Sequence, residues 1–231
     1  MSSHNIPKII HQTWKDDSIP IEYQSYVRSV KKFHSDWEYK LWTDTDMLNF
    51  VKDFYPEFLC IYQNYHTVIQ KCDFFRYLIV KHFGGFYLDL DVEIICSLSE
   101  LIDQQDNVFF VEKILSREEC IFYGNRDSIR ISNYAFGTIP HHIFWDYFLT
   151  YLIQPRFSSR PITNDNDILE STGPGILTTV FHDYNKSYNT PLNVLKPSHS
   201  QESACSCKKG VIPSCTVGKY GYHAHFGTWR L

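Results

Sequence analysis

The sequence predicts an α/β fold with a mostly parallel central sheet flanked by helices. Short apolar runs alternate with segments of helical periodicity over the first ninety residues, and a glycine pair separates the most regular helical segment from the strand after it. Such alternation is typical of parallel sheets, because each crossover helix carries the chain back to the same edge. The 231 residues suit one hydrophobic core without repeats or linkers, so we expect a single domain over 1–231.

The first part of the chain supplies two strands and two helices. Apolar runs predict strands over 8–14 and 38–42. Apolar residues that recur every three or four positions predict helices over 23–33 and 47–54. Each strand is therefore followed by a helix, as in a parallel sheet.

The most regular pattern covers residues 67–93. Apolar residues fall on one helical face as far as residue 79, and Gly84-Gly85 supplies the stop that ends a helix. We expect a buried strand over 86–91 directly after the glycines. Later in the chain, the patterns predict a strand over 107–112 and helices over 143–153 and 173–181.

Composition excludes several classes of protein. The chain is 43% hydrophobic and 21% charged, as in soluble globular proteins, and its net charge of −4 argues against a nucleic-acid partner. It has no run of about 18 apolar residues, so we expect no transmembrane segment. Residues 1–8 lack the pattern of a signal peptide or anchor, which favours a cytoplasmic location.

The seven cysteines form two groups. Cys60, Cys72, Cys96 and Cys120 are scattered among apolar residues, and we interpret them as small core residues. The other three lie together in a polar segment whose spacing is not that of a usual zinc site, so free thiols are favoured over a metal site or a disulfide. These are Cys205, Cys207 and Cys215.

Asp89-Leu90-Asp91 stands at the carboxyl end of the predicted strand over 86–91, the edge at which open α/β sheets bind ligands. In an extended chain, residues i and i+2 point to the same side, so the two carboxylates would face one point. Such a pair repels itself unless a cation lies near it, and oxygen ligands suit Mg²⁺ or Mn²⁺. Two exposed acids at the end of a strand are the alternative, because D-x-D alone is a common pattern.

The neighbouring residues favour the cation. The stretch from Ile69 to Asp91, I-Q-K-C-D-F-F-R-Y-L-I-V-K-H-F-G-G-F-Y-L-D-L-D, resembles the central signature of glycosyltransferase family 32, whose members share a D-x-D sugar-binding region. Five further segments resemble motifs of that family in its own order. They are 6–14 (first strand), 41–44 (second strand), 132–136 (S-N-x-x-F), 172–174 (T-G-P) and 223–229 (a closing His-rich segment, here ending G-T-W).

This resemblance implies a nucleotide-diphospho-sugar transferase fold of the GT-A type, retaining chemistry and a Mn²⁺ (or Mg²⁺) cofactor. Asp91 matches the family's metal-binding acid, and Asp89 matches the acid that meets the sugar and ribose. Asp73 and Arg76 match the pair that grips the donor sugar, and we assign catalytic roles to all four. Asp73 and Arg76 are three residues apart, which places them on one helix face. The alternative to a sugar-binding role for these two residues is an ordinary surface ion pair.

The resemblance also implies donor-binding residues at the ends of the first two strands. His11, Gln12 and Thr13 match the region that packs the base and ribose. Trp14 could stack on the base or belong to the core. Asp44 could bind the base or ribose, or cap a helix.

Further positions follow from the remaining motifs. His223 or His225 would be the third metal ligand, with His223 favoured by its distance from Trp229. Gly221 and Gly227 bracket this segment, and we expect it to close over the donor as a lid. The resemblance also implies donor-binding roles for Tyr87, Asn133 and Trp229. It implies that Thr228 is a further metal ligand.

The sequence therefore predicts a retaining hexosyltransferase that uses GDP-mannose or a UDP-hexose and a glycan, lipid or protein acceptor. A glycoside hydrolase is rejected, because its two acids must flank the scissile bond and two acids on one strand face cannot. Two alternatives stay open: an inactive nucleotide-sugar-binding protein, and a toxin-like effector that glycosylates a host protein.

Overall fold

The computed structural model describes residues 5–103, 105–123, 128–195 and 215–228. Its strands are β1 (Ile9–Thr13), β2 (Glu38–Trp42), β3 (Gly85–Leu88), β4 (Val92–Ile94), β5 (Asn107–Ile114), β6 (Ile129–Thr138), β7 (Val194–Leu195), β8 (Cys215–Val217) and β9 (Gly221–His223). Its helices are α1 (Ile21–Phe33), α2 (Asp44–Phe54), α3 (Leu59–Asn64), α4 (Val68–Phe83), α5 (Arg117–Tyr123), α6 (Ile143–Leu152), α7 (Pro155–Ser158), α8 (Asp165–Ser171) and α9 (Pro174–Ser187). Two short 3₁₀ helices span Pro56–Phe58 and Ser99–Leu101.

Within these residues the strands form two sheets. The larger has six strands in the order β2-β1-β3-β6-β5-β7, and the smaller has three in the order β4-β9-β8. In the larger sheet, β1 is parallel to β2 and β3, and β7 is parallel to β5, whereas β6 is antiparallel to both of its neighbours. The predicted mostly parallel sheet flanked by helices is confirmed.

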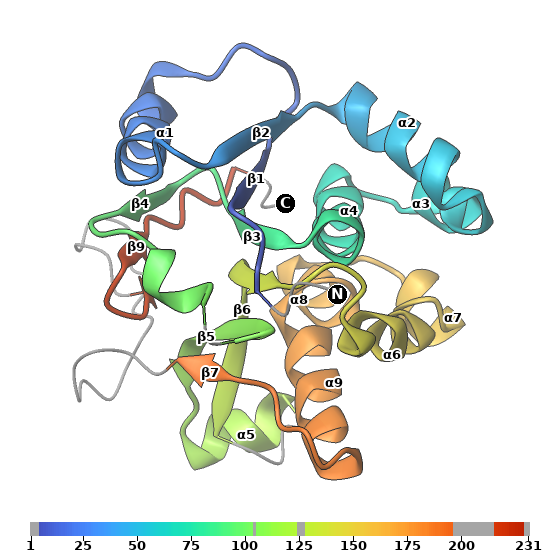
Figure 1. The fold of residues 1–231 in the computed structure, drawn as a ribbon. Coiled ribbons are helices and arrows are strands. Elements are labelled where there is room, and N and C mark those ends of the chain that lie inside the picture. Colours follow the sequence, from blue (N-terminus) through green and yellow to red (C-terminus); the bar gives the residue numbers. More distant parts are fainter. Residues whose placement is uncertain (1–4, 104, 124–127, 196–214, 229–231) are drawn as a thin grey trace.

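The two faces of the sheet bury different cores. Alternate residues of β3 point to opposite faces, so Tyr87 joins one core cluster while Phe86 and Leu88 join another. The Tyr87 cluster draws its other residues chiefly from α2, α4, α6 and α9. The second cluster combines residues of the central strands with residues of α1, the small sheet and the segment between β4 and β5. Figure 1 shows α4, α6 and α9 on one side of the central strands, with α1, β4 and β9 on the other.

Helix α4 leads directly into the D-x-D segment, and both of its ends are defined by specific residues. At its start, the side chains of Thr67 and Gln70 form a reciprocal capping box. At its end, Gly84 and Gly85 have φ values of +67° and +86°. A Cβ on Gly85 would lie 2.5 Å from the backbone oxygen of Ile9, so only glycine fits between α4 and β1.

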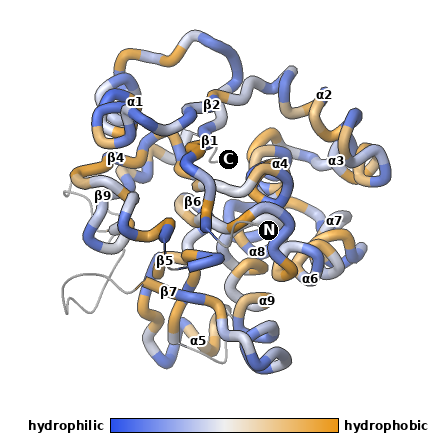
Figure 2. The backbone as a smooth tube through the Cα atoms, viewed as in Figure 1, coloured by the Kyte–Doolittle hydropathy of each residue, from blue (hydrophilic) through white to orange (hydrophobic). Residues whose placement is uncertain are grey.

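The outer helices follow the predicted periodicity. Helix α2 buries Met47, Phe50 and Val51 and exposes Lys52 and Asp53, which gives the alternating hydropathy along α2 in Figure 2.

Strand β6, by contrast, was not expected. Nine of its ten residues are buried, so the polar–apolar alternation that reveals a half-buried strand is absent.

The cysteines occupy different environments from those predicted. Cys60 is exposed on α3, so its interpretation as a core residue is wrong. Cys72, Cys96 and Cys120 are half-buried, and Cys72 and Cys96 pack against the core clusters. Cys215 is the buried cysteine, because it lies in β8 rather than in a polar loop. Burial raises the pKa of its thiol. Cys205 and Cys207 lie outside the described residues.

None of the helices in the described ranges is long and apolar enough to cross a membrane. Helix α4, with 16 residues, carries Asp73 and Arg76 within its span. A transmembrane helix needs about 20 mainly apolar residues.

Candidate active site

The D-x-D segment forms a turn at the end of β3. The strand ends at Leu88, and the backbone N–H of Val92 donates to the backbone oxygen of Asp89 at 3.0 Å. The predicted extended strand through Asp91 is therefore wrong. The turn, rather than the pleat of a strand, brings the two acids to one place.

Buried neighbours hold the carboxylate of Asp89. Its Oδ1 accepts a hydrogen bond from the Tyr87 hydroxyl at 2.7 Å and pairs with Arg76 Nη1 at 3.1 Å. Tyr87 has a single phenolic proton, and it donates this proton to Asp89. The hydroxyl of Thr13 therefore donates to the Tyr87 oxygen, with Thr13 Oγ1 at 3.0 Å from it. The Arg76 guanidinium also lies 4.5 Å from the centre of the Tyr87 ring. Tyr87 and Arg76 together orient Asp89.

Asp91 is held by the C-terminal segment. His223 Nε2 lies 3.0 Å from Asp91 Oδ1, and the backbone N–H of Phe226 donates to Asp91 Oδ2 at 2.9 Å. Burial opposes ionisation, but these partners outweigh it and lower the pKa of Asp91 to about 2. The pairing of β4 with β9 sets this contact, because it places His223 opposite Val92, the residue after Asp91.

Asp89, Asp91 and His223 form a group that could hold a metal ion. Each offers one ligand atom, and these atoms lie within 4.8 Å of one another. His223 Nε2 also lies 3.7 Å from Asp89 Oδ2. Ligands at right angles around a cation such as Mg²⁺ are about 3 Å apart, and a set of carboxylate and imidazole ligands also suits Mn²⁺. The three side chains therefore fit a divalent cation after small adjustments.

Asp73 and Arg76 are both 3% exposed, which excludes the alternative of a surface ion pair. Asp73 Oδ1 lies 3.3 Å from Arg76 Nη2 and accepts from Asn133 Nδ2 at 2.9 Å, while its Oδ2 accepts from Thr172 Oγ1 at 2.9 Å. Burial raises the pKa of Asp73 to about 6, although Arg76 acts in the opposite direction. Asp73 and Asn133 lie behind Arg76 and position it, rather than lining the cavity described next.

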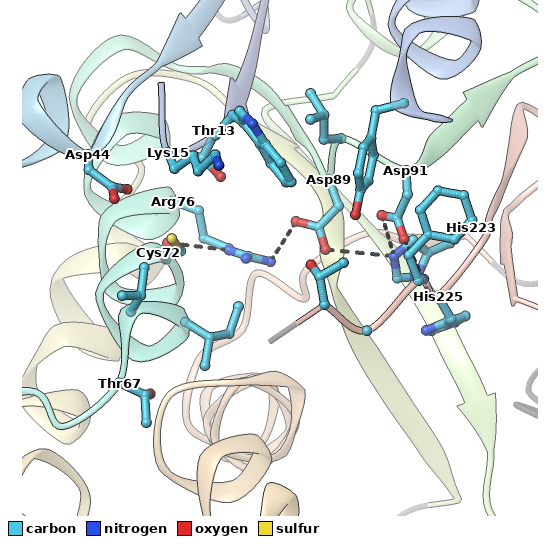
Figure 3. A pocket seen from close by; sticks show the side chains of 18 residues that line it. Thr13, Lys15, Asp44, Thr67, Cys72, Arg76, Asp89, Asp91, His223 and His225 are labelled. Atoms are coloured by element: carbon cyan, nitrogen blue, oxygen red, sulfur yellow. Dashed lines mark hydrogen bonds and ion pairs between the residues drawn. The ribbon is translucent and has the colours of Figure 1, made fainter. Parts of the chain in front are cut away.

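These groups border a cavity of about 480 Å³ (Figure 3). In this view Arg76 points across the cavity toward Asp89, and Asp91 and His223 lie beyond it. The predicted site residues that line the cavity are Thr13, Trp14, Asp44, Arg76, Asp89, Asp91, His223 and Thr228. Eight further residues line the cavity although no site role was predicted for them: Lys15, Tyr23, Thr67, Val68, Ile69, Cys72, Leu90 and Phe226. Ile69, Cys72, Leu90 and Phe226 lie within the matched motifs, and Lys15 follows one directly.

His11 and Gln12 do not line this cavity, so their predicted direct contact with the donor is corrected. His11 accepts from Trp42 Nε1 at 3.2 Å and donates to the backbone oxygen of Gly84 at 2.9 Å. Its burial lowers its pKa to about 4, which keeps the ring neutral. Gln12 Nε2 donates to the backbone oxygen of Asp89 at 3.1 Å. Both side chains face inward because they lie within β1, and Gln12 supports the D-x-D turn.

Trp14 and Asp44 both line the cavity. Trp14 is half-buried, packs on Tyr23 at a ring distance of 4.8 Å and also lines the cavity. The cap of helix α2 is Thr43, so a capping role for Asp44 is wrong.

The C-terminal segment is more ordered than a hinged lid. Gly221 belongs to β9 and lies against the backbone of Glu93, so its predicted role as a flexible hinge is wrong. Gly227 has a φ of +61°, and Phe226 packs edge-on against Tyr23 and Tyr26. Closure over a donor stays a prediction, and Trp229 lies outside the described residues.

Comparison with known proteins gives the family. The family profile "Glycosyltransferase sugar-binding region containing DXD motif" matches residues 20–108. An uncharacterised glycosyltransferase of Acanthamoeba polyphaga mimivirus is 31% identical over 194 residues, which are 81% of this chain and 68% of the viral protein. The chain belongs to glycosyltransferase family 32, the DXD-containing family.

The chain also resembles fungal enzymes. Inositol phosphoceramide mannosyltransferase 1 of Schizosaccharomyces pombe is 32% identical over 82% of this chain and 56% of its own length. A mannosyl phosphorylinositol ceramide synthase of Saccharomyces cerevisiae is 31% identical over 84% of this chain and 47% of its own length. The chain thus spans about half the length of these curated relatives.

Two solved structures share the fold of this chain at low sequence identity, so they support the fold and not the function. The PaToxG glycosyltransferase has a TM-score of 0.56 and 14% sequence identity, over 79% of this chain and 71% of that one. The glycosyltransferase domain of the YGT toxin has a TM-score of 0.50 and 10% sequence identity, over 84% of this chain and 80% of the toxin domain. The chain therefore has the predicted GT-A type fold.

The contact between β4 and β9 gives a testable role to Gly221. A Cβ there would lie 2.1 Å from the backbone oxygen of Glu93, so Gly221→Ala must shift β9 and with it His223, two residues later. We expect at least about a tenfold loss of Mn²⁺ affinity, measured by calorimetry. Tyr222→Phe is the control, because it leaves the backbone of β9 unchanged. Unchanged affinity in Gly221→Ala would contradict this role.

Proposed function

We propose that this glycosyltransferase moves a hexose from a nucleotide-diphospho-sugar to an acceptor hydroxyl, with retention and with a requirement for Mn²⁺ or Mg²⁺. The observation that carries the proposal is the convergence of Asp89, Asp91 and His223 at the wall of the cavity beside Arg76. Mannose is the favoured hexose, from GDP-mannose rather than a UDP-hexose, since the fungal relatives are named mannosyltransferases. A single catalytic domain over 1–231 is part of the proposal.

The acceptor class is proposed on the same basis. The relatives' names specify inositol phosphoceramide, so a lipid headgroup is favoured over a glycan or a protein. The hydroxyl of such a headgroup would reach the cavity from its open side.

The charges of the site suit a diphosphate. A bound divalent cation acts as a Lewis acid that neutralises charge on the departing diphosphate. Without it, Asp89 and Asp91 would repel a phosphate oxygen. Arg76 is permanently charged and is fixed by Asp73 and Asp89, so it presents a preorganised donor to an oxygen of the sugar or phosphate.

Retention requires that bond breaking and bond making take place on one face of the sugar. The bond from C1 to the diphosphate oxygen breaks, the bond from C1 to the acceptor oxygen forms, and the acceptor proton passes to the leaving phosphate oxygen. The carboxylates among the cavity-lining residues are Asp44, Asp89 and Asp91, and the last two belong to the proposed cation site. We assign none of them as a covalent nucleophile.

Hydrolysis of the donor tests this function without a known acceptor. The protein is incubated with GDP-mannose, UDP-glucose, UDP-galactose and UDP-N-acetylglucosamine, with Mn²⁺ or with EDTA, and the first anomer released is followed by proton NMR. We expect cation-dependent release of the hexose with the anomeric configuration of the donor. Equal release in EDTA would contradict the cation requirement, and the opposite anomer would contradict retention.

A further inference from the structure

The imidazole of His223 has a polar partner at each of its two ring nitrogens. Its Nε2 faces the acids, 3.0 Å from Asp91 Oδ1 and 3.7 Å from Asp89 Oδ2. Its Nδ1 lies 3.1 Å from Nε2 of His225. In Figure 3, His225 lies beyond His223 as seen from Asp89. Nε2 is therefore the nitrogen of His223 that faces the proposed cation, and Nδ1 is held from behind.

A cation would select the direction of the hydrogen bond between the two histidines. A neutral imidazole carries one proton, and a nitrogen that binds a cation must offer its lone pair. With a cation at Nε2 of His223, the proton of that ring is on Nδ1, which donates it to His225. Nε2 of His225 is then the acceptor, so the proton of His225 is on its own Nδ1. A hydrogen bond from the second nitrogen fixes the tautomer of a ligating histidine in this way.

The other tautomer of His223 would not bind a cation. With its proton on Nε2, the ring would donate to Asp91, whose Oδ1 is 3.0 Å away. An acceptor at position 225 disfavours this state, because it draws the proton to Nδ1. The apparent affinity for a cation falls with the fraction of protein in the competent state, so removal of the acceptor would weaken binding.

Tyr134 fixes the plane of the same ring. It stacks on His223 with a centroid distance of 4.1 Å and an interplanar angle of 25°, and it meets His225 edge-on at 5.8 Å. Its hydroxyl donates to the backbone oxygen of Thr216 at 3.1 Å, and its backbone oxygen accepts from the N–H of Asp89 at 2.8 Å. Tyr134 is 2% exposed. One buried residue thus contacts both the D-x-D turn and the ring of the histidine.

We propose that His225 and Tyr134 are positioning residues for the cation site: His225 sets the tautomer of His223, and Tyr134 sets the plane of its ring. The group of side chains that could hold a metal ion contains His223 but not His225. Tyr134 stands at an unspecified position of the S-N-x-x-F segment, so the motif assigns it no role. The inference rests on the proposed function, since it requires a cation at this site.

The chain offers a matched control for substitutions of His225. The φ of His225 is +54°, in the left-handed region, and His141 has a φ of +55°. His141 is exposed and makes a ring contact with His82 on α4, away from the cation site. The same substitution at the two positions meets a similar backbone conformation. A difference in cation affinity therefore reports the contact between His225 and His223.

The test measures binding of Mn²⁺ alone by calorimetry, with thermal unfolding as the control for folding. His225→Leu should weaken Mn²⁺ binding at least about tenfold, because it removes the acceptor. His225→Gln should stay within about threefold of the wild type, because its amide oxygen can replace Nε2 as acceptor. Tyr134→Leu should also weaken binding at least about tenfold, whereas Tyr134→Phe keeps the ring and should not. His141→Leu should leave the affinity unchanged.

Nitrogen NMR of the wild-type protein tests the tautomers without a variant. Histidine labelled with ¹⁵N is observed through long-range couplings to the ring protons, with saturating Mg²⁺ in place of the paramagnetic Mn²⁺. We expect both His223 and His225 to carry their proton on Nδ1. A proton on Nε2 of either ring would overturn the assignment, and this result does not depend on whether a variant folds.

The inference and the proposed function fail in different ways. If folded His225→Leu binds Mn²⁺ as tightly as the wild type, or if His225→Gln loses as much affinity as His225→Leu, the role of His225 as an acceptor is overturned while the cation site stands. Equal affinities of Tyr134→Leu and Tyr134→Phe would overturn the role of the Tyr134 ring. A wild-type protein that binds neither Mn²⁺ nor Mg²⁺ would contradict the cation site of the proposed function, and this inference with it.

Discussion

Replacing Asp91 with Asn is expected to lower sugar transfer and Mn²⁺ affinity by at least about 100-fold while the fold survives. Asp91 is 7% exposed, and its two oxygens lie against His223 and the backbone of Phe226. Asparagine keeps the shape and one acceptor oxygen but removes the negative charge that attracts a cation. Initial rates over a Mn²⁺ titration, together with thermal unfolding, measure both effects.

Asp53→Asn provides the control for loss of a negative charge, because Asp53 is exposed on α2. If Asp91→Asn kept full activity in EDTA, the cation would have no part in the reaction. If it unfolded, the Mn²⁺ dependence of the wild-type enzyme would still test the requirement.

Arg76→Lys is expected to lower kcat by at least about 100-fold and to destabilise the protein by about 3 kcal/mol. The guanidinium contacts Asp73 at 3.3 Å, Asp89 at 3.1 Å and the backbone oxygen of Asn133 at 2.8 Å. A lysine ammonium cannot reach all three in one geometry, so a buried carboxylate would lose its partner.

Steady-state kinetics with a saturating donor and calorimetric unfolding separate the two effects of Arg76→Lys. Arg28→Lys on α1 is the control, since Arg28 is exposed. A variant that is destabilised but turns over at the wild-type rate would show that Arg76 only supports the fold.

Periodicity predicted the first half of the fold because its elements are locally regular. Strand β1 begins with a short apolar run, helix α1 buries residues at helical spacing, and Gly84-Gly85 marks the end of α4. The predicted single apolar face of α4 is wrong, because all residues from Asp73 to Val80 are buried. Strand β6 does not alternate because both of its faces are buried, and its place between β3 and β5 depends on contacts distant in the sequence.

The site was predictable to the extent that its residues belong to recognised motifs. Asp89 and Asp91 were expected to face one point, but a turn achieves this rather than a strand. His223 lies 132 positions from Asp91, and only the pairing of β4 with β9 brings the two together. Local pattern cannot show such a pairing, and the order of the family motifs supplied it instead.

Burial also separates residues that share a motif. His11 and Gln12 stand beside Thr13 and Trp14 in the sequence, but the first two face the protein interior and the last two line the cavity. His11 and Gln12 lie inside β1, which is paired on both sides, whereas Thr13 and Trp14 lie at and beyond its carboxyl end beside the cavity. A sequence motif marks all four without distinguishing the residues of the cavity wall from those that support it.

Coordination of the cation by His223 tests the central claim most directly. Pulsed electron paramagnetic resonance of the Mn²⁺-loaded protein detects a directly bound imidazole through the modulation from its nitrogen. We expect this modulation in the wild-type protein, its retention in His225→Gln and its loss in His223→Gln. Nitrogen modulation of equal depth in wild type and His223→Gln, or none in either, would contradict a cation site built from Asp89, Asp91 and His223.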